Sequence, residues 1–402
     1  MKIAILGAGI GGMAAAWDLA RTGHIVTIYE AADHVGGLAS GFKQPGWDWS
    51  VEKFYHHWFQ SDAHMLGLIE ELGLSQNVLF PRPYTVLYDN GKWYPFDSIL
   101  AALAFPGLGF GFDKIRFGLV GLYLRLTNNW RALEQVTVED WMRKWAGNRV
   151  YEKMWQPLII GKFGPFYREV NMAWLWARLK ARTTRLGTYQ GGFQQFCDDF
   201  AEKLRGIGVT IMLSTPIEGI HPAPAGGVTV SLNAEQTQTF DQVLVTTSPG
   251  LLASLAPDLP PQYLAGLQSL KHMGAVVMVL SLKHQLSEDG YYWFNIPKNA
   301  GYPFLAVVEH TNFVSPDHFG GERIVYCGDY LPTDHEFFSL TKEELLGHFL
   351  PALKRFNPNF NPDWVNDSWL FSTKYAQPVP LLNHSQNIPA IQTPIPGLFL
   401  PV

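Results

Sequence analysis

Short apolar runs separated by an amphipathic stretch open the chain. Residues 1–6 are largely apolar, an amphipathic stretch extends to residue 22, and residues 25–29 are apolar again. A short apolar run bounded by glycine is typical of a buried strand, and a mixed run of helical period is typical of a helix with one buried face. The pattern therefore predicts a strand, a helix and a second strand, joined as a βαβ unit.

A similar alternation returns along most of the remaining chain, with glycine or proline near the ends of the segments. The predicted helices cover residues 61–72, 137–146, 172–180, 194–207 and 341–356. The predicted strands cover residues 209–213, 228–232, 242–246, 275–282, 323–327 and 397–400. This order of elements indicates an α/β protein.

The segments fall into two alternating groups, which predicts two interleaved domains rather than two consecutive ones. The first group resembles the opening unit and covers residues 1–85, 185–265 and 375–402. The second group differs in pattern and covers residues 86–184 and 266–374. A chain of 402 residues is long enough for two such domains.

Composition narrows the class of protein. Hydrophobic residues make up 47% of the chain and charged residues 16%, which fits a globular chain with a large core. A net charge of −5 gives no support to a nucleic-acid partner. Aromatic residues reach 14%, which indicates an apolar cavity or a membrane-facing surface in addition to the core.

Neither cysteine belongs to a metal-binding or disulfide pattern. Cys197 and Cys327 lie far apart and form no C-x-x-C spacing, so we expect isolated thiols in a reducing compartment and no metal site. The first predicted strand begins at Met1, which leaves no room for a signal peptide. A cytoplasmic location is therefore expected.

Residues 99–126 are unusually rich in leucine, phenylalanine, glycine and alanine, with only four charged residues. Pro106, several glycines and the charges in its middle make this segment a poor transmembrane helix. One interpretation is a buried helix and loop. The alternatives are peripheral contact with the inner face of a membrane, or the mouth of a channel for an apolar substrate.

Glycines follow the first predicted strand in the spacing G-x-G-x-x-G. Gly7 allows a tight turn, Gly9 lets the backbone approach a pyrophosphate, and Gly12 lets the helix pack closely on the sheet. Gly11 lies within the same turn. The helix N-terminus then directs its N–H groups at the phosphates. The alternative is a glycine-rich turn without a ligand.

Two further features strengthen the prediction of a dinucleotide site. Glu30 ends the second strand, where its carboxylate is placed to accept hydrogen bonds from a ribose diol. A second glycine pair, Gly36 and Gly37, follows six residues later. An ADP-containing cofactor fits this unit, and the unit alone does not distinguish NAD from FAD.

The chain resembles the FAD-dependent amine oxidase superfamily, which includes protoporphyrinogen oxidases, carotenoid desaturases and amine oxidases. The resemblance is strongest in residues 7–37 and extends to residues 188–220 and 241–250. It implies that FAD is the cofactor and that the first group of segments forms a Rossmann-like FAD-binding domain with a parallel sheet and a β-meander. The second group would then form an α+β substrate domain.

The resemblance also implies particular cofactor contacts. The pair Gly36–Gly37 would pack against the diphosphate, and Leu38 stands where the family often has arginine or lysine. Ile217 would contact the adenine through its backbone, and Thr247 would lie in the turn that closes over the dinucleotide.

Two departures from the family pattern qualify the resemblance. Amine oxidases carry a lysine near the flavin on a strand of the substrate domain, and Met278 aligns with that position here, which favours a desaturase-like or porphyrinogen-oxidase-like reaction. The family's Gly-Asp motif after the last strand is absent, so we expect the chain to be truncated at its C-terminus.

Candidate catalytic groups lie in two polar clusters. His56 and His57 lie within residues 53–58, whose position matches the family segment beside the isoalloxazine ring. Each is either an acid or base or a structural histidine. Lys162 is either a ligand for a substrate carboxylate or phosphate, or a solvated loop residue. The aromatic residues 291–294 either line an apolar pocket or pack in the core.

The predicted activity is removal of a hydride equivalent from an apolar small molecule, with reoxidation by O₂ or a quinone. The alternatives are a true amine oxidase and a flavin-dependent mutase related to UDP-galactopyranose mutase. The sequence predicts neither the substrate nor the oligomeric state.

Overall fold

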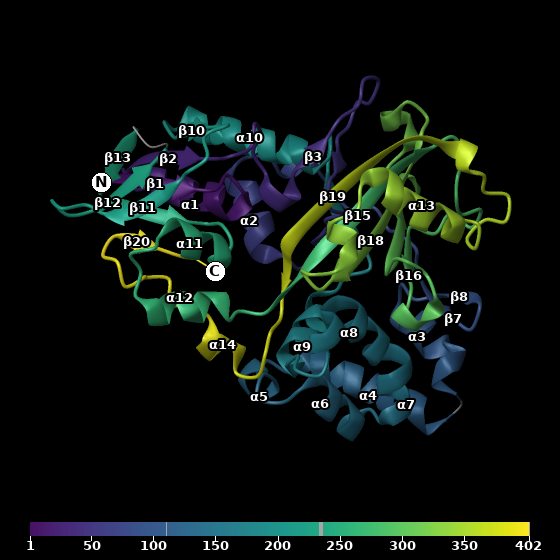
Figure 1. Cartoon of the computed structure of the whole chain (residues 1–402). Coiled ribbons are helices and arrows are strands. Elements are labelled where there is room, and N and C mark those ends of the chain that lie inside the picture. Colours follow the sequence, from purple (N-terminus) through teal and green to yellow (C-terminus); the bar gives the residue numbers. More distant parts are fainter. Residues whose placement is uncertain (110, 233–235, 402) are drawn as a thin grey trace.

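A five-stranded parallel sheet combines two strands from the start of the chain with three strands from later segments (Figure 1). The computed structural model describes residues 1–109, 111–232 and 236–401. Residue 110 of the segment 99–126 and residue 402 of the segment 375–402 lie outside the described part. The strand order is β10-β2-β1-β14-β20. The bounds are β1 Lys2–Leu6, β2 Ile25–Tyr29, β10 Thr210–Met212, β14 Gln242–Val245 and β20 Leu398–Phe399.

Two helices pack their apolar sides against this sheet. They are α1 Ile10–Arg21 and α10 Phe193–Gly206. Met13, Phe196 and Phe200 are fully buried in the core that these helices share with β1 and β2. The predicted strand–helix–strand unit and the predicted helix 194–207 are confirmed to within a residue or two at their ends, because their periodicity is local.

A three-stranded antiparallel meander lies beside the parallel sheet, in the order β11-β12-β13. Its strands are β11 Gly219–Pro222, β12 Val228–Ser231 and β13 Thr237–Phe240. Val228 and Val230 alternate with polar neighbours and are fully buried in a core shared with β1 and β14. The predicted fold class, a Rossmann-like parallel sheet with a β-meander, is confirmed.

A seven-stranded mixed sheet forms the second large layer, in the order β19-β15-β18-β17-β16-β7-β8. β15 is buried along nearly its whole length and pairs antiparallel with β18 and β19. The strands are β7 Thr85–Asp89, β8 Lys92–Pro95, β15 His272–Leu282, β16 Trp293–Asn295, β17 Ala306–Glu309, β18 Arg323–Leu331 and β19 Val365–Pro378. The long β19 was not predicted, because its polar residues face outward from an edge strand.

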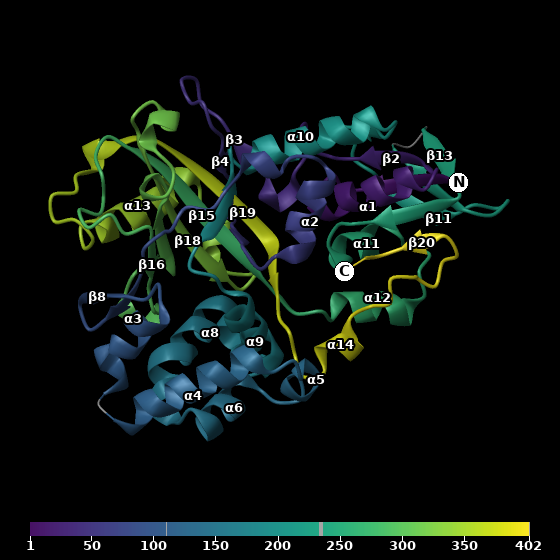
Figure 2. The same ribbon diagram turned by 180° about the vertical axis from the view of Figure 1, so that it is seen from behind.

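Helices from the middle of the chain form a separate group next to the seven-stranded sheet in both views (Figures 1 and 2). They are α3 Ile99–Ala104, α4 Phe112–Leu126, α5 Trp130–Leu133, α6 Val138–Trp145, α7 Asn148–Val150, α8 Gln156–Phe163 and α9 Met172–Ala181. The remaining helices are α2 Ala63–Glu71, α11 Pro249–Leu255, α12 Pro261–Gln268, α13 Lys342–Leu353 and α14 His384–Asn387.

Two small sheets connect the large layers. β3 Gly41–Phe42 pairs with β4 Val51–Glu52, and β9 Leu186–Tyr189 pairs with both β5 Trp58–Phe59 and β6 Val78–Leu79. Residues 54–56, in the segment between β4 and β5, line a pocket that is described below. The parallel sheet and the seven-stranded sheet draw strands from alternating stretches of the chain, which supports the interleaved domains; their residue boundaries stay a prediction.

Candidate functional site

The turn after β1 has the geometry expected of its glycines. Gly7 adopts a φ of +109° and donates its N–H to the carbonyl of Tyr29 at 2.9 Å. A Cβ on Gly12 would lie 2.0 Å from the carbonyl oxygen of Gly7, so only glycine lets the helix come this close. The tight turn and the close helix packing are confirmed, whereas contact with a cofactor stays a prediction.

Gly9 and Gly11 leave open space at the N-terminus of α1. A Cβ at either position would meet no protein atom within 4 Å. Gly9 is in extended backbone, with φ −70° and ψ 173°, so its conformation does not require glycine. The space in front of the helix N-terminus is therefore the reason for glycine here, and it suits an approaching phosphate group.

The second glycine pair lies directly against this turn. Gly36 donates its N–H to the carbonyl of Ala8 at 2.9 Å and forms an isolated parallel bridge with Gly9. A Cβ on Gly37 would lie 3.2 Å from the Cα of Gly9. The two glycine motifs are separate in the sequence, but their backbones lie against each other in the structure. We call residues 7–12 together with Gly36 and Gly37 the glycine cradle.

Glu30 is fixed beside the glycine cradle. Its two carboxylate oxygens accept hydrogen bonds from the backbone N–H groups of Ala8, at 2.8 Å, and Ala32, at 2.9 Å. Each oxygen keeps a further lone pair, so the carboxylate still has the capacity to accept bonds from hydroxyl groups. The role predicted for Glu30 toward a ribose is untested.

Thr247 carries a buried polar atom that lacks a partner. Among the described residues, none forms a hydrogen bond with its Oγ1. Thr247 lies next to the glycine cradle, because its Cγ2 would be 3.3 Å from a Cβ added to Gly7. A buried hydroxyl without a partner is unfavourable unless a ligand completes it. Together with the open space at Gly9, this hydroxyl fits a dinucleotide cofactor.

Ile217, the residue expected at the adenine, is half-buried against the core near β11. Its contact with a cofactor stays a prediction.

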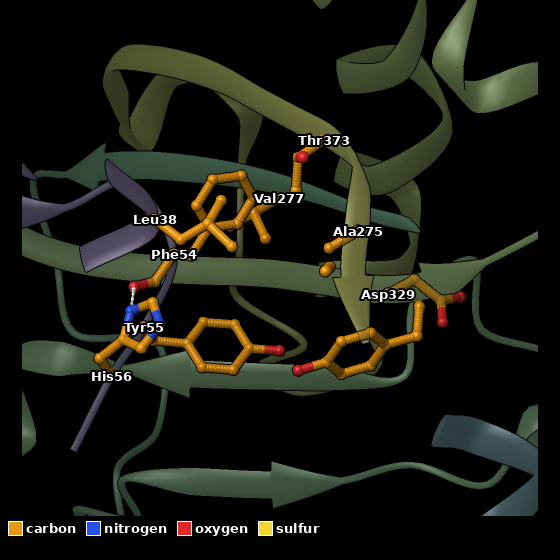
Figure 3. A pocket seen from close by; sticks show the side chains of 10 residues that line it. Leu38, Phe54, Tyr55, His56, Ala275, Val277, Asp329 and Thr373 are labelled. Atoms are coloured by element: carbon orange, nitrogen blue, oxygen red, sulfur yellow. Dashed lines mark hydrogen bonds between the residues drawn. The ribbon is translucent and has the colours of Figure 1, made fainter. Parts of the chain in front are cut away.

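A pocket continues from the glycine cradle toward the seven-stranded sheet (Figure 3). Leu38, directly after Gly37, forms one wall. The other walls come from the segment 54–56 and from residues of β15, β18 and β19. The lining residues are Leu38, Phe54, Tyr55, His56, Ala275, Val277, Asp329, Tyr330, Thr373 and Ala376. A cofactor lying along the cradle would place its far end in this pocket.

His56 and His57 point in different directions. His56 lines the pocket and donates from Nδ1 to the carbonyl of Phe54 at 2.5 Å (Figure 3). His57 lies with Nε2 2.5 Å from the hydroxyl of Tyr292, outside the pocket lining. Burial lowers the pKa of His56, and it lowers the pKa of His57 to about 3. Only His56 is placed to meet a ligand in the pocket.

Lys162 lies in helix α8 and not in the solvated loop that was one interpretation of its sequence. Its Nζ lies 4.0 Å from the ring centre of Tyr330, which lines the pocket. Burial lowers the pKa of Lys162. Burial would raise the pKa of Tyr330, but the charges of Lys162 and Arg178 outweigh it and lower that pKa.

The strand β15 presents small apolar side chains to the pocket. Ala275 and Val277 line it, whereas Met278 points to the opposite face and is fully buried in the core of the seven-stranded sheet. The expectation that Met278 occupies the flavin-facing position is wrong, because successive side chains of a strand alternate between faces. Neither pocket-lining residue of β15 is a lysine.

An ion pair closes one side of the pocket. Asp329 is buried and pairs with Lys298 on the neighbouring turn. Burial raises the pKa of Asp329 to about 6 even though Lys298 opposes the shift. Tyr55 is another polar residue of the lining, and a Cβ on Gly328 of β18 would lie 3.0 Å from its hydroxyl oxygen.

The aromatic residues 291–294 pack in the core and do not line the pocket. Tyr292 is fully buried, Trp293 stands edge-on to Tyr55 at 4.9 Å, and Phe294 belongs to the core of the seven-stranded sheet. Tyr330, Thr373 and Ala376 line the pocket but were not predicted, because no local motif in the sequence marks them. No group of three or more potential metal ligands gathers within the described residues.

The glycine cradle, the parallel sheet with its meander and the adjoining pocket together define a dinucleotide-dependent protein of the flavoprotein class. A sequence profile described as flavin containing amine oxidoreductase matches residues 10–400. The chain belongs to this family, whose cofactor is FAD.

Curated relatives match parts of the chain. A protein from Synechococcus elongatus described as a probable zeta-carotene desaturase is 28% identical over 279 residues, covering 61% of this chain and 54% of the relative. A 15-cis-phytoene desaturase from the same organism is 28% identical over 158 residues, covering 36% of this chain and 33% of the relative. The chain thus spans about half or less of the length of these relatives.

Solved structures share the fold over nearly the whole chain. An oxidoreductase from Methanosarcina mazei superposes with a TM-score of 0.75 at 17% identity, covering 100% of this chain and 94% of that one. A reduced UDP-galactopyranose mutase superposes with a TM-score of 0.73 at 15% identity, covering 96% of this chain and 85% of that one. At these identities the likeness concerns the fold alone.

Proposed function

We propose that this protein is an FAD-dependent oxidoreductase that removes a hydride equivalent from an apolar small molecule, in the manner of a desaturase or a protoporphyrinogen oxidase. The observation that carries the proposal is the apolar wall of the pocket, formed by Leu38, Phe54, Ala275 and Val277. Such a wall positions a hydrocarbon part of a substrate without competing hydrogen bonds. The curated desaturases among the relatives support the same class.

The protein's own residues would bind, orient and handle a proton. When bound, FAD supplies the acceptor for the hydride equivalent. The glycine cradle and the Thr247 hydroxyl would hold its diphosphate end, and Leu38 would direct its far end into the pocket. The apolar wall would exclude water from the reacting bond.

His56 is the proposed proton-handling residue. Its hydrogen bond to Phe54 holds a proton at Nδ1, which leaves Nε2 as the acceptor atom of the ring. Because burial lowers its pKa, the ring is neutral near pH 7 and suited to accept a proton. For His57, the low pKa and the contact with Tyr292 support a structural role instead.

The alternatives differ at the pocket-facing residues of β15. A true amine oxidase reaction would be expected to use a lysine there, and Ala275 and Val277 argue against it. The mutase alternative is supported by the shared fold alone. We therefore favour a desaturase-like or porphyrinogen-oxidase-like reaction over the amine oxidase and mutase alternatives.

The test begins with the purified full chain supplied with FAD. We expect co-purifying yellow colour with the absorbance bands of oxidised flavin, and bleaching of these bands under anaerobic conditions by a polyene or porphyrinogen substrate. A chain that remains colourless with excess FAD contradicts the proposal. Peroxide formation from a panel of amines, or isomerisation of UDP-galactopyranose without net bleaching, assigns one of the alternatives.

His56→Gln tests the proton-handling role. We expect the rate of flavin bleaching to fall by about 10²-fold, because general base catalysis contributes on this order. His57→Gln serves as the neighbouring control, measured at matched flavin content. An unchanged bleaching rate in His56→Gln would remove His56 from the mechanism.

We further propose that the outer face of α4 contacts the surface of a membrane. Five apolar side chains form one stripe along this helix, and each is more than half exposed: Phe112, Ile115, Leu119, Leu122 and Leu126. The interpretation of residues 99–126 as wholly buried is therefore wrong for α4. Within the described residues no helix is long and apolar enough to cross a membrane, so the proposal is peripheral contact.

One side of α4 packs on the protein through Leu124, which is fully buried, while the apolar stripe lies on the exposed side of the helix. Arg116 donates to the carbonyls of Trp145, at 3.0 Å, and Lys144, at 2.9 Å, and Arg125 donates to the carbonyl of Arg182 at 3.0 Å. An exposed stripe of five large apolar side chains departs from the usual pattern of a surface helix in water. Peripheral attachment at the inner face of a membrane explains the exposed stripe and fits an apolar substrate.

A further inference from the structure

Three basic side chains gather between the group of helices and the pocket. Lys162 lies over the ring of Tyr330, and Arg178 of α9 lies within electrostatic reach of the same tyrosine. Arg182 follows at the C-terminal end of α9 and feels the charge of Arg178. We call Lys162, Arg178 and Arg182 the basic cluster.

The basic cluster has no acidic partner of its own. None of the ion pairs among the described residues includes any of its three members. Asp97 is the one carboxylate that acts on Arg182, and Asp97 already pairs with Arg82 at 3.3 Å. The guanidinium of Arg178 instead lies 5.2 Å from the ring centre of Trp174.

The like charges within the cluster oppose one another. The charge of Arg178 lowers the pKa of Lys162, after burial, and it lowers the pKa of Arg182 in the same way. Arg178 lies in the last turn of α9 and Arg182 is its C-cap, so their like charges repel each other. An arrangement that concentrates repelling cations is relieved when an anion binds among them.

The cluster is accessible to a ligand. Arg178 and Arg182 are exposed to solvent, yet the surrounding protein desolvates both guanidinium groups and lowers the pKa of each. Because Tyr330 lines the pocket and its ring lies 4.0 Å from the Nζ of Lys162, the basic cluster adjoins the pocket at Tyr330.

We infer that the basic cluster binds a carboxylate or phosphate group of the substrate, whose apolar part extends past Tyr330 into the pocket. The inference rests on the proposed function, and it narrows the substrate from an apolar molecule to an amphiphile with an acidic head. The bond from Arg125 to the carbonyl of Arg182 places the cluster next to the end of α4. An amphiphile leaving a membrane at α4 would meet the cluster before the pocket.

The test compares three probes that share one ten-carbon alkyl tail: decanoate and decyl phosphate, each below its critical micelle concentration, and decanol below its aqueous solubility limit. The full chain is titrated calorimetrically with each probe, both loaded with FAD and free of FAD. We expect at least one anionic probe to bind about tenfold more tightly than decanol. A preference for decanoate assigns a carboxylate head, and a preference for decyl phosphate assigns a phosphate head.

Variants connect this preference to the cluster. The double variant Arg178→Gln/Arg182→Gln should bind the anionic probe and decanol within about twofold of each other, whereas Arg178→Lys should keep the preference. Arg168→Gln is the matched control, because Arg168 pairs with Glu139 at 3.4 Å and its side chain is 71% exposed. Thermal melting of each variant confirms that it is folded.

The inference is overturned by equal binding of decanol and both anions, by no binding of either anion, or by a preference that survives in the double variant. Failure of the proposed function is recognised separately, because the absorbance of the FAD-loaded chain is recorded before each titration. A chain that takes up no FAD but keeps the anion preference contradicts the proposed function and supports the basic cluster.

Discussion

At the residue scale, an added methyl group distinguishes glycines that serve the fold from glycines that serve a ligand. Gly12 has the carbonyl of Gly7 where its Cβ would be, whereas Gly9 has open space and an unstrained backbone. Both look alike in the sequence motif. Their difference depends on what lies opposite, which in one case is protein and in the other is the proposed cofactor.

Substitution of these two glycines should therefore have different effects. Gly9→Ala should leave the melting temperature of the FAD-free chain nearly unchanged and weaken FAD binding by about tenfold or more, because the methyl group would occupy the space for the diphosphate. Gly12→Ala should destabilise the FAD-free chain itself. Melting curves and FAD titrations give both quantities. Gly67→Ala in α2, which also meets open space, is the control; equal effects of all three would contradict the cradle.

Glu309 should make stability depend on pH. It is fully buried, and both oxygens accept backbone N–H groups, from Leu286 at 2.7 Å and Ser287 at 2.9 Å. Burial nevertheless raises its pKa to about 7. Since the folded pKa exceeds the unfolded value of about 4.3, the contribution to stability is full below that value and is lost as the pH rises toward 7.

The expected loss is on the order of a few kcal/mol between pH 4.5 and pH 7.5. Urea unfolding of the wild-type chain and of Glu309→Gln across this range isolates the effect, because glutamine does not titrate. The variant is expected to be less stable throughout, since its amide N–H₂ faces a backbone donor, but its pH slope should be smaller. Identical slopes would show that Glu309 does not titrate as described.

At the element scale, the composition of α4 predicts an apolar helix but does not determine which of its faces is buried. The apolar content of residues 99–126 was consistent with either a buried or a membrane-facing helix, and the periodicity of its leucines fits both. Burial of Leu124 against neighbouring helices, together with contacts such as the bond from Arg125 to the carbonyl of Arg182, shows which face packs on the protein. Such contacts join residues up to 57 positions apart and leave no local signal.

Charging the outer face of α4 tests its proposed membrane contact. Leu119→Glu/Leu122→Glu should reduce co-sedimentation with phosphatidylglycerol vesicles by about tenfold or more, because two leucine side chains no longer enter the lipid and two negative charges face an anionic surface. Ile391→Glu, at a residue that is similarly exposed elsewhere, is the control. Unchanged sedimentation of the α4 variant, or an equal loss in the control, would contradict the proposal.

At the scale of the whole molecule, ligand binding at the glycine cradle should stabilise the entire parallel sheet. The sheet joins β1 and β2 to strands that lie about two hundred or more residues later in the chain. FAD at 100 times its dissociation constant should add about 2.7 kcal/mol to the free energy of unfolding. The elements that hold it come from several parts of the chain, so the stabilisation should be global.

Thermal melting with FAD and with riboflavin measures this effect. FAD should raise the melting temperature by several degrees, whereas riboflavin, which lacks the ADP part, should raise it much less, because the glycine cradle is expected to hold the diphosphate. Comparable shifts with the two compounds would place the main binding contacts in the pocket. No shift with FAD would contradict the assignment of the cradle.

The sequence by itself determined the opening βαβ unit, the glycine turn, the class of cofactor and the family, because these depend on residues close together with fixed spacing. Only the tertiary structure decided which side chains meet at the pocket. Ala275 and Val277 face it and Met278 does not, and Tyr330 lies beside Lys162 although 168 positions separate them in the chain. The physical reason is that the surroundings of a side chain depend on which face of a strand it points from and on how distant segments pack together. Neither is determined by a local sequence pattern.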